Sequence, residues 1–206
     1  FPSFSTIQEK SMKKSKALML IGVVLLGALF VLPLWNISLE APQYPEAIGM
    51  NIHVNKIVAM NPNDIKNINI MNHYVGMKDI PEMLPEFKIF PYVVIGMMLL
   101  GLLIGFKLNY RWYLVWFILI CLVGAAGMYD FYLWEYDYGH TLKETAAIKF
   151  KNPDGTPLAY QPPLLGTKTI LNFVAHSYPR SGAYFLFTGM LMAFAAFFIG
   201  KKETKY

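Results

Sequence analysis

Methionine and histidine residues recur at close spacing in the first half of the sequence. Met50 and His53 are separated by two residues, and His73 and Met77 by three. Thioether and imidazole groups together suit copper, and Cu(I) in particular. The spacing therefore predicts a copper site built from these four residues, with His140 from the second half of the chain as a further ligand. Methionines in loops also pack against neighbouring domains without binding a metal, so a structural role is the alternative.

A second candidate is the acidic and aromatic segment of residues 130–140. On a helix, its carboxylates would lie within a turn or two of His140, where they could orient an imidazole or relay protons. The alternative is a belt at a membrane interface, whose acids pair with Lys143, Lys168 or Arg180. The residues assigned to such supporting or docking roles are Asp130, Trp134, Glu135, Tyr136, Asp137 and Tyr138.

The sequence contains none of the common motifs of enzyme active sites, and we expect the protein not to be an enzyme. It has no Gly-x-Ser-x-Gly, no phosphate-binding glycine loop and no His-Glu-x-x-His. Its single cysteine, Cys121, excludes an internal disulfide and any site built from several cysteines. None of its apolar runs carries a charge at the middle, which argues against an ion pump or an ion-coupled transporter.

The composition indicates a protein that contacts a lipid bilayer. Hydrophobic residues make up 55% of the chain and charged residues 15%, whereas soluble domains carry about 25% charged residues. Four apolar runs approach the length of about 20 residues that crosses a membrane; they are residues 17–35, 89–106, 112–129 and 182–200. The first follows a basic segment and lacks a cleavage site, which is typical of an uncleaved signal anchor. The predicted fold class is an all-α membrane protein, a four-transmembrane-helix bundle with a small mixed domain formed by two long loops.

Positive charge is distributed unevenly between these runs. The chain ends and the short turn after the second run carry a net charge of +7, whereas the two long loops, residues 36–88 and 130–181, carry −2. The positive-inside rule then predicts cytoplasmic N and C termini and periplasmic loops in a bacterial inner membrane. The basic residues form no stripe within polar sequence, so we expect no nucleic-acid partner.

Local patterns predict secondary structure in the two loops. Alternating apolar residues around 52–57, together with Ile68 and Ile70, predict short strands in the first loop. Residues 130–140 contain no helix breaker before Gly139, so we expect the third membrane helix to continue to about residue 140 and to stop at this glycine. Residues 167–175 have an amphipathic pattern that predicts a short helix.

Several stretches resemble one family, and the string Asn72-His73-Tyr74-Val75-Gly76-Met77-Lys78 is among the most distinctive of them. The other stretches are residues 33–35, 41–46, 67–69, 129–140, 160–163, 166–168 and 172–173. Together they resemble the small multi-span membrane protein encoded beside the nitrous oxide reductase gene in accessory clusters of the Bacteroidota type. The resemblance implies a part in denitrification, in which the protein matures or supports a periplasmic copper enzyme through copper handling or electron supply. It supplies no set of catalytic residues.

Three functions are compatible with these observations. The leading hypothesis is a non-enzymatic accessory protein that docks a periplasmic copper enzyme of the nitrous oxide reductase type and helps to load its copper. The second is an electron-transfer subunit that binds quinol through Trp134, Tyr136, Tyr138 and His140, in a pocket that opens to lipid. The third is a structural subunit of a larger respiratory assembly, whose partners are other membrane subunits.

Overall fold

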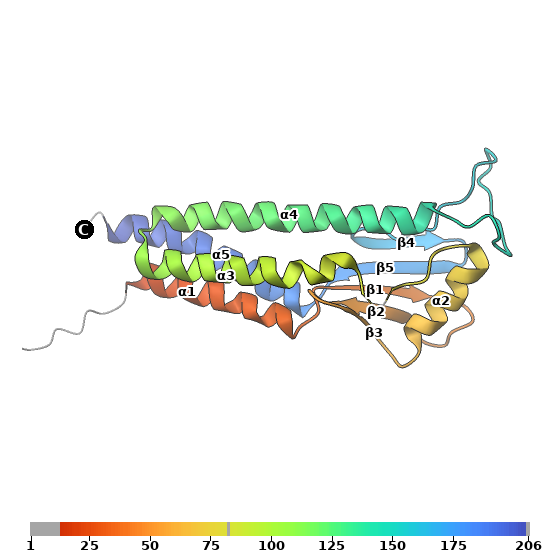
Figure 1. The fold of residues 1–206 in the computed structure, drawn as a ribbon, viewed down its shortest axis with the longest axis horizontal. Coiled ribbons are helices and arrows are strands. Elements are labelled where there is room, and N and C mark those ends of the chain that lie inside the picture. Colours follow the sequence, from red (N-terminus) through yellow and green to blue (C-terminus); the bar gives the residue numbers. More distant parts are fainter. Residues whose placement is uncertain (1–12, 82, 205–206) are drawn as a thin grey trace, which may run out of the picture.

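A bundle of long helices carries a sheet at one of its ends (Figure 1). The computed structural model describes residues 13–81 and 83–204. Two short 3-10 helices are labelled η1 and η2. In chain order, the elements are α1 (Lys14–Leu25), η1 (Leu26–Phe30), β1 (Trp35–Glu40), β2 (Ile48–Ile52), β3 (Ile57–Ala59), α2 (Asp64–Val75), η2 (Pro85–Lys88), α3 (Phe90–Lys107), α4 (Arg111–His140), β4 (Gly166–Ile170), β5 (Phe173–Pro179) and α5 (Ser181–Glu203).

The predicted fold class, an all-α bundle of four transmembrane helices, is wrong. A five-stranded antiparallel sheet accompanies the helices. Among the described residues, three helical segments are long and apolar enough to cross a membrane: Pro85–Lys107, Arg111–His140 and Ser181–Glu203. The error arose because the prediction treated the two long loops as a small addition to a helical protein, whereas the strands of the sheet come almost entirely from these loops.

The first apolar run, residues 17–35, divides between a helix and a strand. It forms the 12-residue α1, continues as η1 to Phe30, and then enters β1 at Trp35. Pro33 explains the break, because proline cannot donate a helical hydrogen bond and disfavours helix in the residue before it. Leu29 and Leu34 therefore still pack in the core of the helix bundle, whereas Trp35 packs against the core of the sheet.

The sheet has the strand order β3-β2-β1-β5-β4, so its middle strand comes from the first half of the chain and pairs with a strand from the second half. Ile37 of β1 lies between Met50 of β2 and Ser177 of β5. One face of the sheet packs against α2 and the end of α4, where Ile37 and Met50 share a core with Ile68 and Tyr138. We call the five strands, α2, residues 130–140 and the loop that follows them the sheet domain.

Two local expectations in this region were also wrong. Ile68 and Ile70, predicted as strand residues, lie in α2. Residues 167–175, predicted as a short helix, form most of a β-hairpin made by β4 and β5. In the hairpin, Ala175 faces the core and His176 faces the other side of the sheet. This alternation has the period of a strand, and the prediction mistook it for the period of an amphipathic helix.

The helix ends that carry basic residues meet at the end of the bundle opposite the sheet (Figure 1). Ser15 at the start of α1 donates a hydrogen bond to Glu203 at the end of α5. Lys16 Nζ donates to the carbonyl of Phe106, 3.2 Å away, at the end of α3. The charge asymmetry of the sequence therefore corresponds to two ends of the folded molecule. Lys10 and Lys205, which were counted in that asymmetry, lie outside the described residues.

Close glycine contacts hold α1 against α5. A Cβ atom built on Gly189 would lie 2.5 Å from the carbonyl oxygen of Gly22, and one built on Gly22 would lie 2.7 Å from that of Gly189. Only glycine permits this approach of two backbones. A Cβ atom built on Gly124 of α4, by contrast, would meet nothing within 4 Å.

We expect Gly189→Ala and Gly124→Ala to have different effects on stability. Alanine is intrinsically favoured over glycine in a helix by about 1 kcal/mol, so Gly124→Ala should be neutral or stabilising. Gly189→Ala should destabilise by about 1 to 3 kcal/mol, because the new methyl group overlaps the Gly22 carbonyl. Thermal unfolding of both variants in one detergent measures the difference. A Gly189→Ala protein as stable as the native one would contradict the close α1–α5 contact.

Candidate functional site

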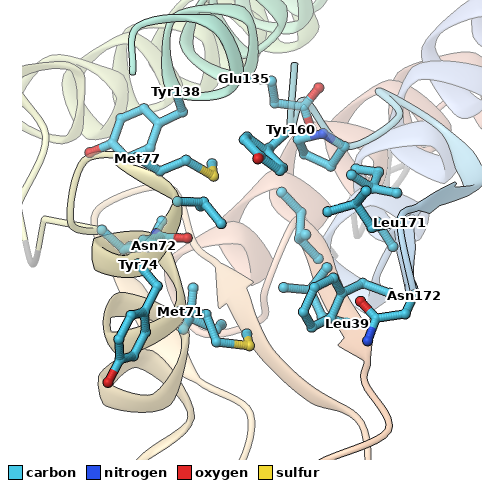
Figure 2. A pocket seen from close by; sticks show the side chains of 18 of the residues that line it. Leu39, Met71, Asn72, Tyr74, Met77, Glu135, Tyr138, Tyr160, Leu171 and Asn172 are labelled. Carbon is cyan, nitrogen blue, oxygen red and sulfur yellow. The ribbon is translucent and has the colours of Figure 1, made fainter. Parts of the chain in front are cut away.

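The sheet domain encloses a cavity of about 350 Å³ between the sheet, α2 and the last turns of α4. Figure 2 shows side chains from these elements projecting into it. The described residues that line it are Ile37, Leu39, Gln43, Met50, Ile68, Met71, Asn72, Tyr74, Val75, Met77, Ile80, Trp134, Glu135, Tyr138, Ile148, Phe150, Tyr160, Pro162, Ile170, Leu171, Asn172, Phe173 and Ala175. The volume falls within the range of about 300–1,000 Å³ that is usual for ligand pockets.

Regular periodicity brings the apolar walls together. On α2, residues 68, 71, 72 and 75 line the cavity, which is the i, i+3, i+4, i+7 spacing of one helical face. On β5, Phe173 and Ala175 alternate with side chains that face the other side of the sheet. Each element therefore contributes one face to the cavity, and nearly all of the contributed side chains are apolar.

Glu135 is the one acidic side chain among the described residues that line the cavity. It is fully buried at 0% exposure, and neither of its carboxyl oxygens has a hydrogen-bond partner in the part of the chain that the structure describes. It lies in the part of α4 that packs on the sheet domain, beyond the run of residues 112–129, since Phe131, Trp134 and Tyr138 belong to the core of that domain. Burial raises the pKa of the Glu135 carboxyl to about 8, so this group is mostly protonated at neutral pH.

The neighbours of Glu135 on α4 also have polar atoms that are taken out of water. The Tyr138 hydroxyl donates a hydrogen bond to the carbonyl of Asp79 at 2.8 Å, and burial raises the pKa of Tyr138 to about 12. The indole Nε1 of Trp134 is also buried, close enough to the Tyr138 hydroxyl to lower the pKa of Tyr138. Among the described residues, the Glu135 carboxyl therefore has no hydrogen-bond partner at this point of the cavity wall.

A segment from the second loop lies across the end of α4 and closes the cavity there. The backbone N–H of Tyr160 donates to the carbonyl of Gly139 at 2.9 Å. A Cβ atom built on Gly139 would lie 2.5 Å from the Cα of Gln161. Glycine at position 139 thus permits this close crossing, whereas the helix itself ends one residue later, at His140.

Part of the cavity lining is exposed at the end of the sheet domain that is farthest from the apolar helices, and we call this exposed part the mouth. Its exposed lining residues include Tyr74, Leu171 and Asn172. The last two form the turn between β4 and β5, and β5 then runs toward the bundle and leads directly into α5 (Figure 1). Leu171 has a φ of 58°, a left-handed conformation that is uncommon and costly for a bulky residue.

The structure separates the five residues that were predicted to bind copper. Met50 and Met77 line the cavity. His73 and His140 are exposed, and His140 stacks on Tyr136 with ring centroids 4.0 Å apart. His53 is half-buried in the turn after β2, where burial and the charge of Lys56 lower its pKa. Within the described ranges, no three His, Cys, Asp or Glu residues form a group that could hold a metal ion.

The predicted supporting residues of α4 divide between two faces. Trp134, Glu135 and Tyr138 face the cavity, whereas Tyr136 and Asp137 are exposed. Asp137 forms an ion pair with Lys78 at 2.6 Å, a partner that the sequence did not suggest. Hydrogen bonds from Lys78 and Thr141 lower the pKa of Asp137. Asp130 lies nearer the bundle and does not line the cavity.

Several lining residues were not predicted as site residues, among them Ile68, Met71, Tyr160 and Ala175. The spacing of residues 68, 71 and 75 was a signal for the face of α2. The expected strands in this segment obscured it. Ala175 and Tyr160 carry no local signal, because their part in the cavity depends on which segments pack together.

We expect the stability of the protein to fall between pH 5 and pH 9 because of Glu135. Its pKa is raised in the folded state from an ordinary value of 4.5 to about 8. The folded state holds this proton more tightly than the unfolded state does, so the free energy of unfolding is highest below the unfolded pKa and falls by about 3 to 5 kcal/mol as the pH rises through the folded pKa of about 8. Glu135→Gln should remove this part of the pH dependence in thermal unfolding. Glu144→Gln, at an exposed position, is the matched control and should behave as the native protein does.

Comparisons with known proteins leave this site to be interpreted from its own chemistry. No protein-family model matches the sequence, and no curated protein matches it.

Proposed function

We propose that this is a membrane-anchored binding protein, which holds an apolar, lipid-like molecule in the cavity of its sheet domain. The observation that carries the proposal is a cavity of about 350 Å³ with almost wholly apolar walls and one buried, unpartnered carboxyl group. A preformed apolar pocket with a few polar groups is the usual form of a small-molecule site.

Three apolar helices supply the anchor. They expose large hydrophobic side chains, such as Leu99 on α3, Leu122 on α4 and Leu191 on α5, which are 62–65% exposed. A soluble protein rarely leaves apolar surface of this extent in water, so lipid covers these faces in the proposed arrangement. The basic end of the bundle lies in the cytoplasm of a bacterial cell and the sheet domain in the periplasm, following the positive-inside rule.

The position of the mouth favours a carrier or presenting role. The mouth is at the end of the sheet domain that is farthest from the helices, whereas the quinol hypothesis expected a pocket that opens to lipid. A ligand that leaves by this mouth meets the solvent or a docked protein. His73 and Tyr74, both exposed, lie at this end and offer a partner aromatic and imidazole contacts.

Filling the cavity tests this proposal. Ala175 is fully buried on the cavity face of β5, so Ala175→Leu should displace the ligand. Val174→Leu adds a single carbon on the opposite face and is the control. The measurement is mass spectrometry of molecules extracted from protein purified in mild detergent. We expect an apolar molecule at close to one per native chain and per Val174→Leu chain, and a severalfold loss in Ala175→Leu.

A second variant covers the case in which Ala175→Leu does not fold. Leu171→Gly should stabilise the protein by about 1 kcal/mol, because glycine adopts a positive φ without strain. It should also release the ligand faster, since a side chain at the mouth is removed. Native protein that carries no apolar molecule, and binds none when it is supplied, would refute the proposed function.

The methionines favour a second proposal, copper handling for a periplasmic enzyme of the nitrous oxide reductase type. Met50, Met71 and Met77 all line the cavity, and Figure 2 shows Met71 and Met77 projecting into it. Thioethers are soft ligands that suit Cu(I). The resemblance to the accessory family supports the same role, with the sheet domain as the surface that docks the copper enzyme.

Titration with Cu(I) against a colorimetric chelator tests this second proposal. We expect about one equivalent per chain if the cavity holds copper, because its thioethers form one soft site. The double variant Met50→Leu, Met77→Leu should then lose the metal. The exposed pair His73→Ala, His140→Ala is the control for binding at the surface, and loss of copper in that variant alone would assign it to the histidines. Absence of stoichiometric copper would refute the role.

A further inference from the structure

The apolar walls explain why hydrocarbon would enter the cavity, but they do not explain Glu135. A carboxyl group buried without a hydrogen-bond partner destabilises a folded protein. Neither oxygen of Glu135 holds another element in place, since both lack a hydrogen-bond partner among residues 13–81 and 83–204. A ligand that completes these hydrogen bonds would remove the cost, which makes the carboxyl group the polar end of the site.

The other groups around the cavity leave Glu135 without a counter-charge. On α4 the titratable lining neighbour is Tyr138, whose hydroxyl is bonded to the Asp79 carbonyl. α2 contributes Tyr74 at the exposed mouth, and the closing segment contributes Tyr160, whose pKa is raised by burial. The strands contribute only apolar side chains. No lysine, arginine or histidine occurs among the described lining residues.

The remaining charges near α4 lie outside the cavity. Asp137 is on the outer face and pairs with Lys78, and Lys168 donates to the carbonyl of Gln161 at 3.0 Å. An anionic head group would thus enter a site with no cation to balance it. A protonated carboxyl group instead offers an O–H donor.

We propose that Glu135 binds the ligand in its protonated form, by donating a hydrogen bond to an uncharged carbonyl oxygen on a hydrocarbon body. Acyl esters and isoprenoid quinones share this chemistry. Free fatty acids and phosphate-headed lipids, which are anionic at neutral pH, are selected against. This inference rests on the proposed function, because it assigns the head group of the ligand that occupies the same cavity.

Protonation of Glu135 then controls release. Burial raises the pKa of this carboxyl to about 8, so the donor is present at neutral pH and is lost above that value. Binding that requires the protonated form weakens by about tenfold for each pH unit above the pKa. Affinity for a carbonyl ligand should therefore be about tenfold lower at pH 9 than at pH 7.

The experiment measures equilibrium binding of a tritiated fatty-acid methyl ester to the full chain in mild detergent, by scintillation proximity from pH 6 to pH 10. Competitors at pH 7 are the unlabelled ester, a quinone with a decyl tail, the free fatty acid and a plain alkane of matched length. We expect the ester and the quinone to compete. The acid and the alkane should compete at least about tenfold less well, because a tenfold loss of affinity corresponds to the loss of about one hydrogen bond.

Variants separate a binding role of Glu135 from a structural one. Glu135→Gln keeps an uncharged N–H donor, so it should bind the ester with little dependence on pH. Glu135→Leu should bind ester and alkane alike. Glu144→Gln, at an exposed site, should retain the native pH profile. If either Glu135 variant fails to fold, the pH profile and the competitor series of the native protein still decide the question.

The outcomes distinguish the two proposals. Equal binding of the ester, the quinone and the alkane at every pH would overturn this inference. The cavity would then take apolar ligands without selection by Glu135. Preference for the free acid would overturn the inference as well. If no probe binds at any pH, the proposed function itself fails. Competition by the quinone as well as by the unlabelled ester supports the inference for both carbonyl sources, and competition by the ester alone supports it for acyl esters.

Discussion

The pairing of β1 with β5 joins the two halves of the chain, and the cavity depends on it. Six residue pairs form this ladder, from Trp35 opposite Pro179 to Glu40 opposite Val174. Ser177, fully buried within it, accepts a hydrogen bond from the Trp35 indole at 2.7 Å and donates one to the Leu164 carbonyl. The backbone N–H of Arg180 donates to the Leu34 carbonyl, so the ladder continues to the point where α5 begins. The sheet is therefore positioned on the helix bundle by main-chain bonds, and residues from both halves of the sequence meet on one face.

One face of the sheet is covered by α2 and the end of α4, and burial between these elements raises the pKa of the Glu135 carboxyl. Glu135 and Asp137 are two residues apart on one helix, yet burial raises the pKa of the first and Lys78 lowers that of the second. The difference arises from which side of α4 meets the sheet domain. Strongly shifted acids in clefts are common at functional sites. In the proposed function the same burial that makes Glu135 costly in the empty protein makes it a hydrogen-bond donor to a ligand at neutral pH.

Parts of this arrangement could be predicted from sequence, and the failures have physical causes. The apolar runs 89–106, 112–129 and 182–200 fall within the three long helices, because length and hydrophobicity are properties of a contiguous segment. The run 17–35 misled the prediction because the helix ends at Phe30 and Trp35 already belongs to a strand of the sheet, and hydropathy alone does not show where a helix ends. The hairpin of residues 166–179 was misread for a related reason: a short amphipathic stretch fits either period. Met50 and His53 were grouped by spacing, but a strand and its turn direct one into the core and leave the other half-exposed.

The sequence by itself determined that most of the chain's polar residues lie outside its long apolar runs, and that net positive charge is concentrated in the chain ends and in the short turn after the second run. Charge and hydrophobicity are summed along the chain, so they need no knowledge of contacts. Only the tertiary structure decided that a cavity exists, that Glu135 and not Asp137 faces it, and that its mouth lies away from the helices. These properties follow from long-range strand pairing between residues more than a hundred positions apart, and from the face that each helix turns toward the sheet. Neither is encoded in any single segment, because a side chain's surroundings are supplied by other parts of the chain.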